Sequence, residues 1–222
     1  MARLARVILP NYPHHIIQRG NRRQDVFFNA EDYEYYLDLL KEWCKEEELD
    51  VWAYCLMTNH VHLIISPNTH SNLSRAIGEV HRRYTRMINF REKWRGYLWQ
   101  GRFSSFPMEE DWLLKAVAYV ELNPVKAGMV DSAWDYPWSS VHAHLSESDK
   151  FGLVNTDKMS SLVRDWKSYL LDAQDQSIED FAKHERTGRP LGSDSFIERA
   201  ESLLNRDLKK KKPGPKVLVE DN

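Results

Sequence analysis

The chain has 222 residues, of which 42% are hydrophobic and 29% are charged, and its formal net charge is −2. This composition excludes a disordered chain and a fibre, and no apolar run approaches the roughly 18 residues that a membrane span needs. The first ten residues lack the apolar stretch of a secretory signal, and two cysteines cannot form a disulfide scaffold, so we expect a reduced, cytoplasmic protein.

The near-neutral total conceals three charge zones. Residues 29–50 carry nine acids and two lysines, for a net charge of −7, whereas residues 75–102 carry eight basic side chains and two acids, for +6. Residues 206–216 have a net charge of +5, and the first 23 residues contain five arginines and no acid. This separation favours a polyanion partner, nucleic acid above all, over charges that merely solvate helix faces.

Apolar periodicity divides the first half of the chain into strands and helices. Asn29 and Asn72 (or Ser71) are suitable helix N-caps, and Thr58-Asn59 is a two-residue turn between two apolar runs. In chain order, we predict a strand over 14–19, a helix over 31–48, strands over 51–57 and 60–66, and a helix over 73–92.

The second half begins with a predicted strand over 97–108 that contains a glycine irregularity. Three acids at 109–111 suit the first turn of a helix that runs through Tyr119 and ends near residue 123, because Pro124 disfavours helical geometry before it. Further helices are predicted over 138–145, 158–172, 177–185 and 194–207, before a Lys/Pro/Gly-rich tail.

This order of elements is typical of an α+β protein with a ferredoxin-like antiparallel sheet, helices on one face and a helical C-terminal extension. We expect a core domain over residues 1–146 and the extension over 147–207. The basic tail over 208–222 is expected to have no fixed structure unless it is bound.

His60 and His62 are the most distinctive pair for chemistry. They lie two residues apart on a predicted strand and therefore point to the same face, while Val61 points into the core. Two neighbouring neutral imidazoles can bind one divalent cation. The pattern also fits two polar side chains on a half-exposed strand, so the pair alone leaves both interpretations open.

Tyr119 and Asn123 lie four residues apart and share one face of the predicted helix. A core tyrosine and a helix-terminating asparagine explain this segment alone at least as well as a site does. Together with the two histidines, however, Tyr119 and Asn123 form a coherent candidate site. In that site, Mg²⁺ or Mn²⁺ keeps open coordination positions for a phosphate oxygen, and Tyr119 attacks the phosphorus atom. The sequence shows no obvious general base, and metal-bound water is an alternative.

Three segments resemble the single-tyrosine HUH transposases, and more closely the branch associated with repetitive extragenic palindromes (REPs). They are N-H-V-H-L-I at 59–64, L-W-Q-G-R-F at 98–103 and Y-V-E-L-N-P-V-K-A-G-M-V at 119–130. Supporting matches are H-x-I-x-R-G-N at 15–21, W-S-S at 138–140 and T-G-R-P-L-G at 187–192. The resemblance covers about residues 5–216, and the combined order and spacing make it specific.

The resemblance implies that His60, His62 and Asn123 hold Mg²⁺ or Mn²⁺, and that Tyr119 forms a 5′-phosphotyrosine and leaves a 3′-hydroxyl. Asn123 stands where many relatives have glutamine, and Lys126 replaces a frequent arginine. The implied activity is that of a DNA transposase and endonuclease on single-stranded hairpin DNA. The implied setting is a bacterial cytoplasm, with the protein on the nucleoid when bound, and we expect a monomer rather than a dimer.

Basic and aromatic residues between 82 and 102 fit that substrate, because cations track phosphates and aromatic rings stack on unpaired bases. We expect at least half of these rings, which include Trp94 and Tyr97, to belong to the core instead. The lysine tail either reaches into a duplex groove or only aids solubility. The residues expected to contact DNA are Arg82, Arg83, Arg86, Arg95, Arg102, Trp99, Lys209, Lys210, Lys211 and Lys212.

Two other function classes stay open. A non-catalytic protein that binds nucleic-acid hairpins on the same scaffold would bind without metal and never cleave, and the intact set of two histidines, tyrosine and asparagine argues against it. A metal-dependent hydrolase of small substrates would need further clustered histidines and acids, which the sequence lacks.

Overall fold

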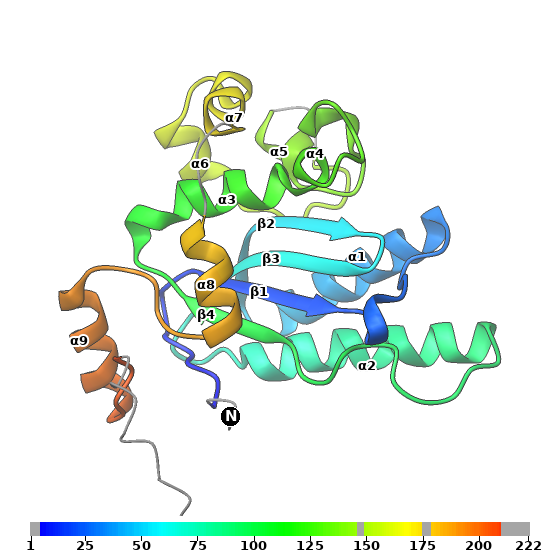
Figure 1. The fold of residues 1–222 in the computed structure, drawn as a ribbon, viewed down its shortest axis with the longest axis horizontal. Coiled ribbons are helices and arrows are strands. Elements are labelled where there is room, and N and C mark those ends of the chain that lie inside the picture. Colours follow the sequence, from blue (N-terminus) through cyan, green and yellow to red (C-terminus); the bar gives the residue numbers. More distant parts are fainter. Residues whose placement is uncertain (1–4, 146–148, 175–178, 210–222) are drawn as a thin grey trace, which may run out of the picture.

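A four-stranded antiparallel sheet forms the centre of the computed structural model, which describes residues 5–145, 149–174 and 179–209 (Figure 1). The strand order is β2-β3-β1-β4, reached through a β-α-β-β-α-β succession. The strands are β1 (His14–Arg19), β2 (Leu49–Met57), β3 (His60–Pro67) and β4 (Ser104–Pro107). This is the ferredoxin-like arrangement, so the predicted fold class is confirmed.

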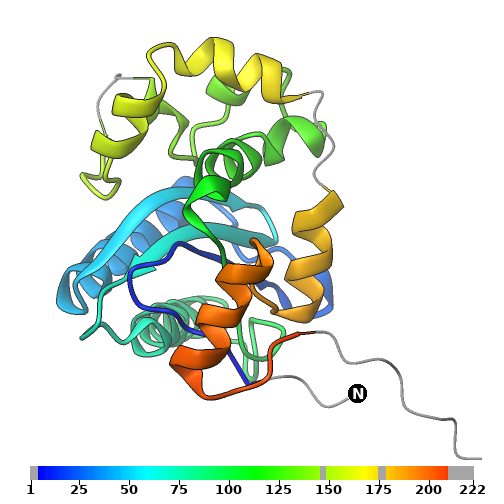
Figure 2. The same ribbon diagram turned by 90° about the vertical axis from the view of Figure 1, so that its left-hand side faces the viewer.

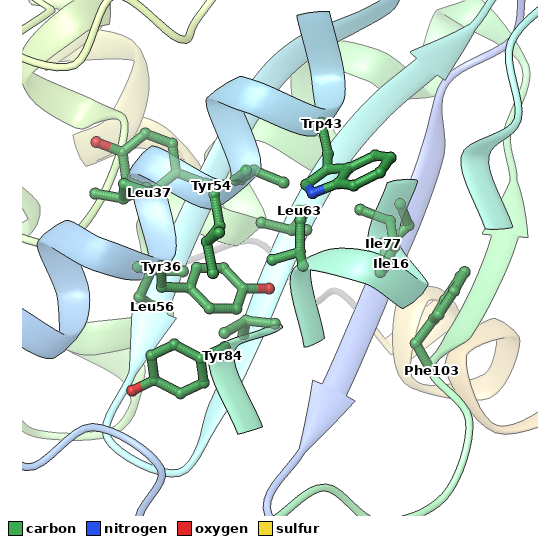
Figure 3. Packing of buried hydrophobic residues seen from close by; sticks show 14 of the residues in the cluster. Ile16, Tyr36, Leu37, Trp43, Tyr54, Leu56, Leu63, Ile77, Tyr84 and Phe103 are labelled. Atoms are coloured by element: carbon green, nitrogen blue, oxygen red, sulfur yellow. The ribbon is translucent and has the colours of Figure 1, made fainter. Parts of the chain in front are cut away.

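Helices α1 (Ala30–Glu46) and α2 (Leu73–Arg91) cover one face of the sheet (Figure 2). Both begin where predicted, since the Asn29 side chain accepts the amide of Asp32 at 3.0 Å and Asn72 accepts that of Arg75 at 2.9 Å. Every second strand residue points at these helices and forms an apolar core with them. Figure 3 shows part of this core, including Ile16, Tyr36, Leu37, Trp43, Tyr54, Leu56, Leu63, Ile77 and Tyr84.

The opposite face of the sheet is covered by helices from the second half of the chain. Helix α3 (Leu113–Glu121) packs on β2 and β3, α8 (Glu179–Thr187) packs on β4, and α7 (Trp166–Gln174) packs on α3. The prediction placed helices on one face and left the helices of the extension unplaced. Because α3 and α8 enclose the second face, polar side chains that point there from the strands are buried.

The remaining elements are short connections and one terminal helix. Helix α9 (Asp194–Leu204) packs through Phe196 on Val7 and Leu9 near the start of the chain, and Leu208 joins that cluster. The others are η1 (Asn21–Arg23), η2 (Glu110–Trp112), α4 (Asn123–Lys126), η3 (Ala133–Asp135), α5 (Val141–His144) and α6 (Asp157–Leu162). No helix within the described residues is long and apolar enough to cross a membrane.

Two predicted elements differ from the structure for local reasons. The strand predicted over 97–108 is reduced to β4, because Gly101 inside it adopts a positive φ of 69° and interrupts the extended backbone. The helix predicted over 158–172 is two helices, since the carboxylate of Asp165 accepts the amide of Ser168 at 3.0 Å and starts α7 anew.

Candidate active site

Three histidines share the face of the sheet that α3 and α8 cover. His60 and His62 alternate with core residues along β3, and His15 lies on the neighbouring β1, where Ile17 pairs with His62. His15 Nε2 lies 2.9 Å from His62 Nδ1, and the rings of His60 and His62 are 4.9 Å apart. The predicted common orientation of His60 and His62 is therefore confirmed, and a third imidazole joins them.

Burial keeps these imidazoles neutral. It lowers the pKa of His15 to about 3 and, together with the charge of Arg19, that of His60 to about 4. The pKa of His62 is well below its usual value, first through burial and then through His15, His60 and Arg19. A neutral imidazole is the form that binds a metal ion, so near pH 7 the cluster is in its ligating state.

Tyr119 lies on α3 directly over the histidines. Its ring meets those of His15 and His62 edge-on, with centroid distances of 5.6 and 5.9 Å. On its other side it stacks on Phe181 of α8, with centroids 5.0 Å apart and planes 10° from parallel. Burial raises the pKa of the Tyr119 hydroxyl, and the carboxylate of Glu185 raises it further.

Glu185 on α8 is the acidic member of the site. Its Oε1 accepts a hydrogen bond from the Tyr119 hydroxyl at 3.0 Å and lies 3.8 Å from His15 Nδ1. Burial raises the pKa of this carboxyl, against the opposing effects of the Tyr119 hydrogen bond and Arg19. His15, His62 and Glu185 each offer a ligand atom within 4.8 Å of the others, so the donor set fits a divalent cation.

The side chain of Asn123 is turned toward its own helix. Its amide nitrogen donates to the carbonyl of Tyr119 at 2.8 Å and approaches that of Val120 at 3.5 Å. The reason is local, because α3 ends at Glu121 and Pro124 has no N–H with which to satisfy the carbonyl of Val120. The structure thus brings together His60, His62 and Tyr119, and it engages the amide nitrogen of Asn123 with backbone carbonyls.

Sequence analysis missed His15 and Glu185. His15 stands in the H-x-I-x-R-G-N match at 15–21, to which no role was given, although its alternation with Ile16 puts it opposite the core. Glu185 carried no usable signal, since it is one of several charged residues on a helix far along the chain. Only the packing of α8 on β4 places it beside Tyr119.

A second buried carboxylate fixes the end of the tyrosine helix. Glu121 is fully buried on roughly the opposite side of α3 from Tyr119. It accepts hydrogen bonds from Ser140 Oγ at 2.6 Å and from Trp166 Nε1 at 2.8 Å, and His144 Nδ1 lies 2.6 Å from it. Two segments, α5 with its N-cap and α7, are therefore joined to α3 through one side chain, which restricts the rotation and sliding of the helix that carries Tyr119.

A cavity of about 270 Å³ opens beside Glu185, the carboxylate that accepts the hydrogen bond of the Tyr119 hydroxyl. Three arginines, Arg19, Arg102 and Arg186, line it together with Glu185. Positive charge next to a buried hydroxyl suits a phosphate group, because guanidinium groups bind phosphate oxygens in bidentate fashion. Arg102 is thus a predicted DNA-contacting residue that lines the same cavity as Glu185.

The other predicted DNA contacts are distributed over the rest of the molecule. On α2, which lies across the sheet from Tyr119, Arg82 pairs with Glu79 at 2.6 Å and Arg83 with Glu42 at 2.9 Å. Trp99 is only 5% exposed and packs on His81, so its ring is not open to a base. Arg86 and Arg95 are exposed, Lys209 pairs with Glu198 at 2.8 Å, and Lys210, Lys211 and Lys212 lie outside the described residues.

Comparisons with known proteins identify the family and the fold. The family model "Transposase IS200 like" matches residues 9–123. A protein of Haemophilus influenzae, named as a REP-associated tyrosine transposase, is 29% identical to this chain over 113 residues. The match spans 46% of this chain and 64% of that protein, which is less than two thirds of its length. A structure of a REP-associated tyrosine transposase bound to a REP hairpin superposes with a TM-score of 0.58 and 21% identity, over 71% of this chain and 90% of that one, and shows the same fold.

Proposed function

Because the chain belongs to the IS200-like transposase family, we propose that it cleaves and rejoins single-stranded hairpin DNA through a covalent bond to Tyr119. The observation that carries this proposal is the Tyr119 ring, which meets the imidazoles of His15 and His62 edge-on, with His60 beside His62. A phenol beside neutral metal-binding groups supports phosphoryl transfer to tyrosine, because a bound cation would stabilise charge on the phosphate that the phenol attacks.

In the proposed reaction, the Tyr119 oxygen forms a bond to phosphorus while the bond from phosphorus to the 3′ oxygen breaks. The products are a 5′-phosphotyrosine and a 3′-hydroxyl, and attack by a 3′-hydroxyl on the phosphotyrosine reverses the step. A divalent cation, Mg²⁺ or Mn²⁺, would be held by His60 and His62 and would stabilise negative charge on the phosphate. Asn123 would offer its amide oxygen as a third ligand, while its amide nitrogen donates to the carbonyl of Tyr119.

The proposed path of the DNA starts at the cavity that Arg102 and Glu185 both line. Exposed aromatic residues follow along the loop after α2, where Tyr97 is 85% and Trp94 44% exposed. Stacking on such rings contributes about 1–3 kcal/mol per base and needs unpaired bases. Arg86 and Arg95 would supply phosphate contacts near the same loop.

We further propose a REP-like hairpin as the natural substrate, with the H. influenzae relative and the hairpin-bound structure as support. Residues 1–146 would be the catalytic domain, 147–207 an extension that supplies α8, and 208–222 an arm that contacts the duplex. We expect a monomer associated with the nucleoid. Light scattering at micromolar concentration tests the monomer, and a dimer would contradict it.

A denaturing gel tests the proposed function. Labelled hairpin DNA from the region that flanks the gene is mixed with protein in Mg²⁺, in Mn²⁺ and in EDTA. We expect a protease-sensitive, slower band that requires metal and is absent for Tyr119→Phe, while that variant still binds the DNA. Tyr35→Phe on α1, across the sheet, is the matched control and should form the band. Tight binding with no adduct in either metal would instead support the non-catalytic hairpin-binding protein.

A further inference from the structure

The hydroxyl of Tyr119 must lose a proton before or during attack, and its hydrogen bond shows which group can take it. The hydroxyl donates to Glu185 Oε1 at 3.0 Å, within the range in which a general base acts directly. Phe181 and Glu185 are four residues apart on α8 and share one helix face. Phe181 stacks on the tyrosine ring while Glu185 meets its oxygen, so one helix face positions both ends of the side chain.

The other charged or titratable groups around Tyr119 are less suited to take the proton. His15 and His62 bond to each other, and their rings meet the edge of the tyrosine ring. The ammonium of Lys126 lies 5.3 Å from the centre of the ring, and as a cation it has no lone pair for a proton. Arg19 is likewise permanently charged, and its field lowers the pKa of Tyr119.

We propose that Glu185 is the general base of the tyrosine, a role that rests on the transposase reaction proposed above. As the Tyr119 oxygen bonds to phosphorus, its O–H bond breaks and the proton moves to Glu185 Oε1. The 3′ oxygen leaves with the electron pair of its bond to phosphorus and takes a proton from solvent. In the rejoining step, Glu185 returns its proton to the departing tyrosine oxygen.

The surroundings of Glu185 strengthen it as a base. Its side chain is only 21% exposed, so little water competes with the Tyr119 hydroxyl for the carboxylate. The neighbouring Arg186 and Arg102 on the cavity wall would bind the phosphate within reach of the tyrosine oxygen.

Two other roles for Glu185 make opposite predictions. As a metal ligand with His15 and His62, it would act through the affinity for the cation, and excess Mn²⁺ would compensate for its loss. If Glu185 only holds the tyrosine in an inactive position, its removal would accelerate the reaction. If Glu185 is a general base, its removal slows adduct formation. Extra metal does not restore the rate, whereas a more acidic phenol at position 119 does.

Single-turnover adduct formation by the full chain at saturating Mn²⁺ separates these roles. We expect Glu185→Gln to lower the rate by about a hundredfold or more, which is the usual contribution of a general base. Installing 3,5-difluorotyrosine at position 119, a phenol that ionises more easily, should restore at least about a tenth of the lost rate in the Gln variant. Asp172→Asn, an exposed acid on α7, is the control and should react at the unaltered rate. Thermal melts establish that both variants fold.

The outcomes are distinguishable. An unchanged or increased rate in Glu185→Gln, recovery with higher Mn²⁺, or failure of the fluorinated tyrosine to rescue would overturn the role of Glu185 and leave the proposed function standing. No adduct from the unaltered chain would overturn both proposals. A slow Gln variant that difluorotyrosine rescues, with unchanged Mn²⁺ affinity, supports the general base.

Discussion

The same strands build two unlike faces of the sheet. Along β3, Val61, Leu63 and Ile65 point at α1 and α2 and join an apolar core, whereas His60 and His62 point at α3 and α8. On the first face, mutual burial of apolar surface is the main source of stability. On the second face, the strands present imidazoles to a tyrosine and a carboxylate. Because strand residues alternate between the two faces, neighbouring positions contribute to stability and to chemistry in turn, and single mutations can change one without the other.

The largest contrast is expected between two residues of β3. Leu63→Ala should lower the free energy of unfolding by about 2–5 kcal/mol and keep adduct formation wherever the protein stays folded. His60→Ala, on the other face, should change that free energy by about 1 kcal/mol or less and abolish metal-dependent adduct formation. Urea unfolding and the denaturing gel measure the two quantities. Equal losses of stability, or an active His60 variant, would mean that the faces are not separate in this way.

A smaller effect concerns stability in acid, because each face of the sheet buries at least one neutral histidine, such as His15 on one side and His81 on the other. Burial lowers the pKa of His15 and of His81 to about 3, against 6.5 when unfolded. Below pH 6.5 the histidines bind protons in the unfolded chain but stay neutral in the folded chain. Their contribution to the free energy of unfolding is therefore complete above that pH and falls toward pH 3. Each histidine adds a slope of about 1.4 kcal/mol per pH unit.

Urea unfolding at pH 7 and pH 5.5 checks this slope. His81→Asn should show a shallower loss of stability on acidification than the unaltered chain, whatever its stability at pH 7. A protein that is equally stable at both pH values would show that the two histidines are protonated in the folded state.

The smallest expected effect is on the affinity for hairpin DNA, and it differs between arginines on the two sides of the sheet. Arg102→Ala should weaken binding to hairpin DNA several-fold and reduce the salt dependence by about one phosphate contact, because Arg102 lines the cavity beside Glu185. Arg82→Ala should change less, since Arg82 pairs with Glu79 on the far side. Fluorescence anisotropy at several salt concentrations measures both, and a larger effect of Arg82 would place the DNA on the α2 side.

Local signals in the sequence were sufficient for much of the fold. The caps at Asn29 and Asn72 and the turn at Thr58-Asn59 depend on residues close in the chain, and the structure confirms each. Periodicity of two was enough to put His60 and His62 on one face. The strand over 97–108 was predicted too long, because the positive φ of Gly101 depends on how the loop leaves the sheet.

The rest of the site depends on contacts between distant segments. Glu185 meets Tyr119 across 66 positions of the chain, and Ser140 and Trp166 meet the buried Glu121 from two further segments. Each of these side chains belongs to a helix or turn whose local pattern would suit several packings. No periodicity within one element indicates which helix covers the tyrosine, so the acidic partner was missing from the predicted site.

The position of α8 after α3 in the chain also sets the order in which the site is made. A ribosome that adds roughly 5–20 residues per second needs about 3–13 s to go from Tyr119 to Glu185. During that interval, the nascent chain already holds all four strands and the tyrosine helix, while the carboxylate has yet to be synthesised. A product released early, between residues 146 and 184, would carry the histidines and the tyrosine without Glu185, so completion of translation itself completes the site.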